Sequence, residues 1–207
     1  MQWELDFLHW FQSIHTPVMD VIMAFLSLFS EAGIGWILLA LILIFIPKYR
    51  KAGWAIGIAL VFSVIFCNGI MKPLVHRIRP YDVDTTLRTV IDGIKFLPYQ
   101  HDYSFPSGHT SASFAAAVAL ICFKDKRKEG IAAVILAALI AISRLYLSMH
   151  YPTDVLVSMI LGSVYGVCGY IIVRIVINKT KLKPLLLGKV GYIEFFKGKG
   201  KKAKKEE

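Results

Sequence analysis

The chain has few of the side chains from which metal sites and disulfide frameworks are built. Among its 207 residues there are only three cysteines and six histidines. Cys67, Cys122 and Cys168 lie within apolar runs, and their odd number predicts neither a disulfide framework nor a zinc site. We expect them to pack as small apolar residues. Asp82 and Asp84 lie in a polar loop, where we expect them to be solvated, so no metal or other cofactor is predicted.

Acidic residues are also scarce, with 14 Asp and Glu against 24 Lys and Arg, and the formal net charge is +10. The imbalance is concentrated in residues 178–207, which carry ten Lys and three Glu. We expect this segment to be a solvated, basic cytoplasmic tail that is attracted to anionic lipid headgroups. No nucleic-acid partner is predicted, because no nucleic-acid-binding motif accompanies the basic run.

The first residues, Met-Gln-Trp-Glu-Leu-Asp, are acidic and precede no small-residue cleavage site, so no secretory signal peptide is expected. Residues 2–15 instead place Trp3, Phe7, Trp10 and Ile14 on one helical stripe. The opposite side carries the polar residues Gln2, Glu4, Asp6, His9 and Gln12. This pattern predicts an amphipathic helix at the membrane interface, where Trp is favoured.

Apolar residues, in contrast, make up 56% of the chain, and the mean hydropathy of +0.58 indicates an integral membrane protein. We predict an all-α, six-span transmembrane bundle formed by a single domain, residues 1–177. The expected spans are 17–30, 33–46, 53–71, 109–123, 131–149 and 153–177. The first two are shorter than the ~20 residues that a bilayer needs. Either their flanks extend them, or residues 30–33 join them as a tight helical hairpin.

Lys and Arg in short loops predict the orientation. Basic residues crowd the loop around 48–51, the loop around 124–128 and the tail. With six spans these segments share one side, which should be the cytoplasm, together with both termini. The loop 72–108 and the turn 148–152 then face outside.

Three polar clusters interrupt the apolar segments, each where a membrane helix would meet water. The first is Lys72-Pro-Leu-Val-His-Arg-Ile-Arg79-Pro80, and the second is Pro106-Ser-Gly-His109. The third is Ser143-Arg144 followed by His150 and Asp154. Charged residues beside membrane spans are costly and indicate function. Cations, imidazoles and a carboxylate together are what phosphoryl transfer requires.

The cations and the second cluster are suited to holding an anion. Lys72, Arg79 and Arg144 are candidates to clamp phosphate oxygens, since Arg presents a planar fork and Lys a point charge. Ser107 is a natural helix N-cap, and Gly108 lets the backbone approach a ligand. The helix N-terminus that follows adds free N–H groups and a positive dipole end.

His150 and Asp154 lie four residues apart, with Pro152 between them. Proline disfavours a helical conformation at the preceding residue, so the pair should span a turn into the last helix. Asp154 is then placed to accept a hydrogen bond from one ring nitrogen of His150, which leaves the other nitrogen as a nucleophile. The alternative is a hydrogen-bonded histidine at a helix entrance with no catalytic role.

The pattern K-x6-R-P, P-S-G-H and S-R-x5-H-x3-D resembles the type 2 phosphatidic acid phosphatase superfamily over roughly residues 18 to 177. The resemblance implies that His150 attacks phosphorus and forms a phosphohistidine, while Asp154 orients His150. It implies that His109 protonates the leaving oxygen and then helps water attack. The groups implied to hold the phosphate are Lys72, Arg79, Ser107, Gly108 and Arg144.

The expected function is therefore that of a membrane lipid phosphatase that acts without metal, with a lipid phosphate or pyrophosphate as substrate and membrane lipids as partners. Within the family we favour a polyprenyl pyrophosphate such as undecaprenyl pyrophosphate. The alternative substrates are phosphatidylglycerophosphate and phosphatidic acid. A lipid or ion transporter would not need the second histidine or the buttressed His-x3-Asp. Vanadium-dependent haloperoxidases have a similar site but are larger soluble proteins.

Several other residues can be explained by solvent exposure, helix capping or packing without a catalytic role. We expect Glu31 to face water or cap a helix, and His76 and Arg77 to touch substrate or face water. Small residues over 110–119, and the series Ser158, Gly162 and Gly166, should serve close helix packing.

Overall fold

The computed structural model describes residues 2–179, 181–189 and 191–196, and within them it is all-helical with no strand. The elements are α1 (Gln2–Ser13), α2 (Pro17–Phe29), η1 (Glu31–Gly33), α3 (Ile34–Phe45), α4 (Arg50–Phe62), the π-helix η2 (Ser63–Met71), α5 (Lys72–Val75), α6 (Pro80–Val83), η3 (Thr85–Arg88), α7 (Thr89–Gly93), α8 (Gly108–Ile121), η4 (Lys124–Lys126), α9 (Arg127–Tyr146), α10 (Pro152–Lys179), α11 (Lys183–Leu186) and α12 (Tyr192–Phe196).

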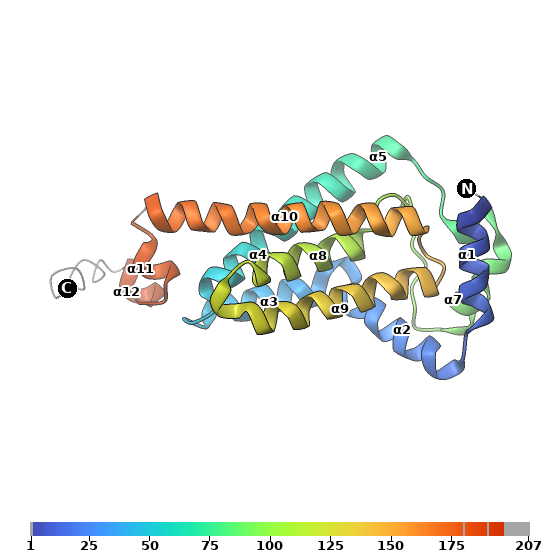
Figure 1. Cartoon of the computed structure of the whole chain (residues 1–207), viewed down its shortest axis with the longest axis horizontal. Helices are drawn as coiled ribbons and strands as arrows, with labels where there is room; N and C mark the ends of the chain where they lie inside the picture. Colours follow the sequence, from blue (N-terminus) through green and yellow to red (C-terminus); the bar gives the residue numbers. More distant parts are fainter. Residues whose placement is uncertain (1, 180, 190, 197–207) are drawn as a thin grey trace.

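Helix α8 lies at the centre of the bundle and packs against α4, α9 and α10 (Figure 1). Most of its residues are buried, and most of these are Ala or Ser, which allow close approach. A Cβ added at Gly162 would lie 2.4 Å from the Ser111 carbonyl oxygen, and one at Gly166 would lie 2.7 Å from the Ala115 carbonyl oxygen. The expected close packing of these small residues is therefore confirmed.

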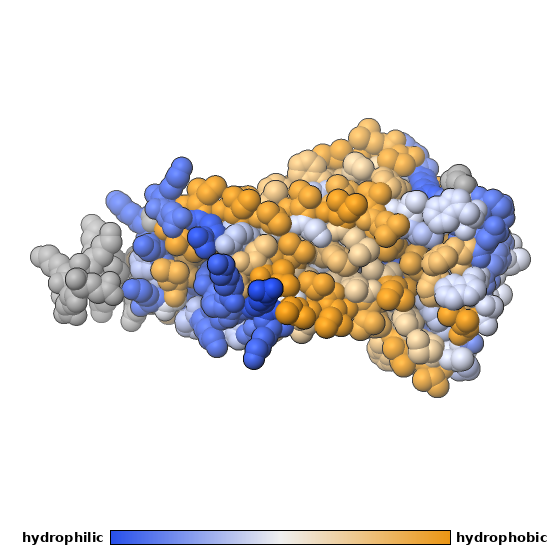
Figure 2. Space-filling model, viewed as in Figure 1, coloured by the Kyte–Doolittle hydropathy of each residue, from blue (hydrophilic) through white to orange (hydrophobic). Residues whose placement is uncertain are grey.

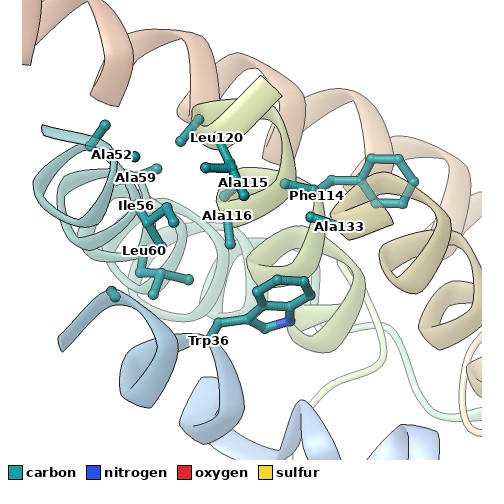
Figure 3. Packing of buried hydrophobic residues seen from close by; sticks show 14 of the residues in the cluster. Trp36, Ala52, Ile56, Ala59, Leu60, Phe114, Ala115, Ala116, Leu120 and Ala133 are labelled. Atoms are coloured by element: carbon teal, nitrogen blue, oxygen red, sulfur yellow. The ribbon is translucent and has the colours of Figure 1, made fainter. Parts of the chain in front are cut away.

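The apolar core extends from this contact toward α3 and α4. In Figure 3, Trp36 lies below Ala116, with Ile56 and Leu60 on the neighbouring helix. The indole N–H of Trp36 donates to Ser113 Oγ at 2.8 Å, so the ring contributes apolar area without leaving a buried donor unpaired.

Among the described residues, three helical stretches are long and apolar enough to cross a membrane: Arg50–Val83, Lys124–Tyr146 and Pro152–Lys179. A fourth candidate is the pair Pro17–Phe29 and Glu31–Phe45, whose axes are bent by 43°. A bend of 43° does not reverse the chain as a tight hairpin would, and the pair counts at most as one broken span. The shorter apolar helix α8 lies among them, and the six expected spans are not confirmed.

The three basic segments meet at one end of the bundle. Lys51 pairs with Asp125 at 3.1 Å, which joins the α3–α4 loop to the α8–α9 loop. Arg50 donates to the Leu185 carbonyl at 2.9 Å, which brings the start of the tail to the same place. Figure 2 shows apolar side chains over the middle of the molecule and hydrophilic ones toward both ends. The rest of the tail, residues 197–207, lies outside the described residues.

Helix α1 lies at the opposite end from α11 and α12 (Figure 1). The N-terminal helix and the start of the basic tail thus lie at opposite ends of the bundle, whereas both termini were expected on the cytoplasmic side. The stripe residues Trp3 and Trp10 are both 55% exposed, as an interfacial helix requires. Glu4, which the pattern placed on the polar side, is buried at 3% exposure. The position of α1 at the interface itself stays a prediction.

Candidate active site

All the site residues expected from the three clusters lie at the end of the bundle near α1. Lys72 begins α5, Ser107 caps α8, Arg144 lies in the last turn of α9, and Asp154 lies in the first turn of α10. Each of their side chains is buried. A second apolar cluster, which includes Leu8, Met23, Leu87, Ile91, Leu147 and Tyr151, packs beneath this end. This cluster fixes α1, α2 and the long loop relative to the turn that carries His150.

His150 lies in the turn between α9 and α10 with 1% exposure. Its Nε2 is 3.5 Å from Arg79 Nη1, and the arginine N–H group faces the ring nitrogen. Burial, followed by the charge of Arg79, holds the pKa of His150 well below its ordinary value. The ring is therefore neutral near pH 7, and the lone pair that a nucleophile needs is present.

Asp154 faces the other ring nitrogen, but Nδ1 and Oδ2 are 3.6 Å apart, longer than a hydrogen bond. Ser104 lies between them. Its hydroxyl donates to Asp154 Oδ2, and its Oγ is 3.4 Å from His150 Nδ1. The backbone N–H of Tyr151 also donates to Asp154 Oδ2, at 3.0 Å. The expected direct His150–Asp154 bond is thus replaced by an arrangement in which a serine joins the two.

Arg77 is the counter-ion of Asp154. Its Nη1 donates to Asp154 Oδ1 and to Thr153 Oγ1, the latter at 2.8 Å. Its Nη2 donates to Glu4 of α1 at 2.5 Å, and its guanidinium lies over the Tyr151 ring, 3.8 Å from the centroid. Of the two expectations for Arg77, substrate contact or exposure to water, neither describes this position. The N-terminal helix is instead tied to the carboxylate beside His150.

Lys72 and Arg79 share one carboxylate, that of Asp102. The Lys72 ammonium and Arg79 Nη2 donate to its two oxygens, and Arg79 Nε donates to the Asp102 carbonyl at 2.8 Å. Although burial opposes ionisation, these donors lower the pKa of Asp102 to about 2. The ionised Asp102 carboxylate is therefore bound by Lys72 and Arg79, two of the cations that were expected to hold phosphate.

Arg144 is fully buried, and its Nη1 donates to Ser27 Oγ. Within the described part of the chain, its Nε and Nη2 have no hydrogen-bond partner. Buried donors are almost always paired, so unpaired guanidinium N–H groups indicate an anion that binds there.

At the start of α8, Ser107 Oγ accepts hydrogen bonds from the Thr110 backbone N–H at 3.4 Å and from the Thr110 hydroxyl at 3.0 Å. The N-cap expected for Ser107 is confirmed. The Ser107 backbone N–H donates to Ser158 Oγ at 2.7 Å and so is not free for a ligand. A Cβ added at Gly108 would lie 3.2 Å from Asn68 Oδ1. Glycine at this position therefore lets the Asn68 side chain lie close to the backbone at the start of α8.

His109 Nε2 is 3.2 Å from Glu31 Oε2, and Gln100 Nε2 donates to both Glu31 oxygens at 3.1 and 3.2 Å. Glu31 was expected to face water or cap a helix, and it instead contacts an expected catalytic residue. A cavity of about 250 Å³ opens beside this pair. It is lined by Glu31, Lys72, Asp102, Gly108 and His109, among others. His150 is not among the residues that line this cavity.

The network includes four residues with ionisable or hydroxyl groups close to the expected catalytic residues that were not expected in the site: Glu4, Glu31, Asp102 and Ser104. Asp102 and Ser104 lie just before Pro106-Ser-Gly-His109, so their proximity to a motif was an available signal. Glu4 and Glu31 lie in other segments, and nothing in the sequence signalled that they would lie near the motif residues. Within the described residues, no group of three or more His, Cys, Asp or Glu is arranged to hold a metal ion.

The comparisons with known proteins agree with the sequence resemblance. The PAP2 superfamily model matches residues 52–179. Lipid A 4'-phosphatase of Bacteroides thetaiotaomicron is 30% identical over 82% of this chain and 76% of its own. Undecaprenyl-diphosphatase BcrC of Bacillus subtilis is 31% identical over 83% of this chain and 91% of its own. The crystal structure of a PAP2-type phosphatidylglycerolphosphate phosphatase from Bacillus subtilis has the same fold, with a TM-score of 0.63, 22% identity and 87% coverage of each chain.

Proposed function

Because this chain belongs to the PAP2 superfamily, we propose that its buried polar cluster is the active site of a membrane phosphatase that hydrolyses lipid phosphates. One observation supports this function above the others. The neutral His150 directs Nε2 toward Arg79, in a cluster with two further cations, Lys72 and Arg144. A nucleophile with a lone pair among fixed cations suits attack on a phosphate group.

In the first step, His150 Nε2 attacks phosphorus, and the bond from phosphorus to the leaving oxygen breaks. His109 gives its proton to that oxygen, and a phosphohistidine remains. Asp154 and Ser104 hold the Nδ1 side of the ring while positive charge develops on it. The unpaired N–H groups of Arg144 receive phosphate oxygens.

In the second step, water attacks phosphorus, and His109 accepts the proton of that water. The bond from phosphorus to Nε2 breaks, which releases inorganic phosphate and restores neutral His150. No metal takes part, since the cations and the α8 N-terminus supply the positive charge.

Substrate binding requires Asp102 to move. Its carboxylate occupies Lys72 and Arg79, so an incoming phosphate competes with it for the same N–H groups. Because Asp102 is half exposed and lies in a loop, its displacement does not disturb the core. A dianionic or trianionic headgroup, such as a phosphate monoester or a pyrophosphate, competes better than a monoanion.

For the substrate we propose a polyprenyl pyrophosphate such as undecaprenyl pyrophosphate. The relative BcrC, named an undecaprenyl-diphosphatase, supports this choice by its length coverage of 91%. The alternative is phosphatidylglycerophosphate or phosphatidic acid. Phosphatidylglycerophosphatase B of Bacillus subtilis, 32% identical over 55% of this chain, supports that alternative.

We further propose that the site faces outside and the basic end faces the cytoplasm, in accordance with the distribution of Lys and Arg. With an odd number of crossings, α1 then lies outside with the site. This placement lets Glu4 reach the active site from the same side of the membrane.

The function is tested by phosphate release from purified protein in detergent, with undecaprenyl pyrophosphate, phosphatidylglycerophosphate and phosphatidic acid supplied in turn and excess chelator present. We expect turnover of all three, with kcat/KM highest for the pyrophosphate by at least about tenfold. A preference for either glycerolipid would contradict the substrate proposal alone. Absence of release from every substrate, or release restored only by Mg²⁺, would contradict the proposed mechanism.

A further inference from the structure

We propose that Glu31 is a positioning residue for proton transfer by His109: its carboxylate orients the imidazole and balances the positive charge on it. This inference rests on the proposed phosphatase function and extends it to a residue outside the three motif clusters. Glu31 lies 78 positions before His109, in the break between α2 and α3.

The contact is part of a small hydrogen-bonded set. Glu31 Oε2 is 3.2 Å from His109 Nε2, and the amide of Gln100 donates to both carboxylate oxygens. Gln100 fixes the plane of the carboxylate, so the carboxylate can fix the ring. The Glu31 side chain is 29% exposed and lines the cavity beside the ring, whereas that of His109 is 9% exposed. A carboxylate that served only the solvated surface would not be held in this way.

The backbone is specially shaped to bring Glu31 to this place. Ala32 has φ 48° and Gly33 has φ 72°, and both lie in the left-handed region, which alanine rarely adopts. Such conformations persist where the surroundings enforce them, and they cluster at functional sites. Here Ser30 Oγ donates to the His109 carbonyl at 3.3 Å and lies 3.1 Å from Ser113 Oγ. These contacts therefore join the break between α2 and α3 to the first turns of α8, which carry His109 and Ser113.

The charges of the site explain why a carboxylate is needed there. His109 must carry a proton to act as the acid, but its burial, followed by the charges of Arg144 and Arg79, disfavours a positive charge on the ring. Asp102 is engaged by Lys72 and Arg79. Asp154 is likewise engaged by Arg77. Within the described part of the chain, Glu31 is the carboxylate that contacts His109. It stays ionised while the proton moves from His109 to the leaving oxygen in the first step and from water to His109 in the second.

The test is Glu31→Gln, which keeps the size of the side chain and removes its charge. Release of the leaving group in a single turnover is measured on two substrates, dioctanoyl phosphatidic acid and 4-nitrophenyl phosphate, because hydrolysis of the phosphoenzyme is common to both. The alkoxide of dioctanoylglycerol needs a proton to leave, whereas nitrophenolate leaves without one. Since general acid catalysis contributes about 10²- to 10⁴-fold, we expect the rate of this release to fall at least about tenfold on phosphatidic acid and less than about threefold on the aryl ester. Equal losses on both substrates, or no loss on either, would overturn the proposal.

Because both rates come from one preparation, their ratio does not depend on how much of the variant is folded. Glu31→Asp keeps the charge, and we expect it to restore part of the ratio; a ratio no better than that of Glu31→Gln would count against a role for the charge. The matched control is Glu129→Gln, the same change at the opposite end of the bundle, where Glu129 accepts from Tyr49. Its ratio should equal that of the wild type. Turnover that survives in His150→Ala would contradict the proposed function itself, and this inference with it.

Discussion

Replacing Arg77 by methionine is the perturbation with the largest effect expected outside the motif residues. Arg77 binds Asp154 and Glu4 at once and stacks on Tyr151. Methionine keeps most of the apolar length of the side chain and removes the charge and all the hydrogen bonds. The Asp154 carboxyl group, at 0% exposure, would then have lost its counter-ion.

The expected magnitude follows from this burial. Removing one partner of a buried ion pair costs about 3–5 kcal/mol, because the remaining charge is left without compensation. Asp154 keeps its bonds from Ser104 and the Tyr151 N–H, so we expect the lower part of this range, about 3 kcal/mol. Turnover should fall by about 10- to 100-fold, if Arg77 supports Asp154 as strongly as outer-shell partners support metal-bound histidines.

The assay is unfolding of wild type and variant in the same detergent, followed by phosphate release at a temperature where both are folded. Arg88→Met is the matched control. Arg88 pairs with Asp82 on the surface, with side chains 40% and 43% exposed, and such pairs contribute about 0–1 kcal/mol. If Arg77→Met were as stable and as active as Arg88→Met, the assignment of Arg77 as the support of Asp154 would be wrong.

Three further predictions concern the loop, the nucleophile and the orientation. Asp102→Asn removes the charge that competes for Lys72 and Arg79, so inorganic vanadate should inhibit this variant more tightly than the wild type; equal or weaker inhibition would contradict the competition. The lowered pKa of His150 keeps its ring neutral as pH falls through 6.5, so kcat/KM measured between pH 5 and 8 should show no loss from protonation of the free nucleophile near 6.5. In a chain without native cysteines, Cys placed at Tyr99 should react with an impermeant thiol reagent added to intact cells, and Cys placed at Lys126 should not; the reverse labelling would invert the proposed topology.

Motif spacing predicted which side chains meet, because the clusters combine charge that is costly near a membrane with a helix start or a proline turn. Lys72, Arg79, Arg144, His109 and His150 all lie at one end of the bundle as the pattern indicated. The hydrogen-bond partners of these side chains were not predicted from the sequence. The Arg77–Glu4 and His109–Glu31 contacts join residues 73 and 78 positions apart, and no periodicity or spacing signals such a pair.

The course of residues 17–45 was also beyond the sequence. Length and hydropathy are the same for a hairpin of two short helices and for one span with a break. The difference lies in the backbone of Ala32 and Gly33, whose left-handed conformations bend the axis by 43° without reversing it. Glycine favours such a turn, but its presence does not specify the angle. The proposed number of crossings, and with it the proposed side of the N-terminus, depends on this single feature.

The central claim is that His150 becomes phosphorylated during turnover. The direct measurement is a rapid acid-free quench of enzyme mixed with a lipid phosphate that carries a labelled terminal phosphorus, followed by detection of label on the protein. We predict a label that is stable to alkali and lost in acid, as a phosphoramidate is, and that is absent from His150→Ala, which should also release no phosphate. Normal phosphate release by His150→Ala, or an unchanged label on it, would contradict the account.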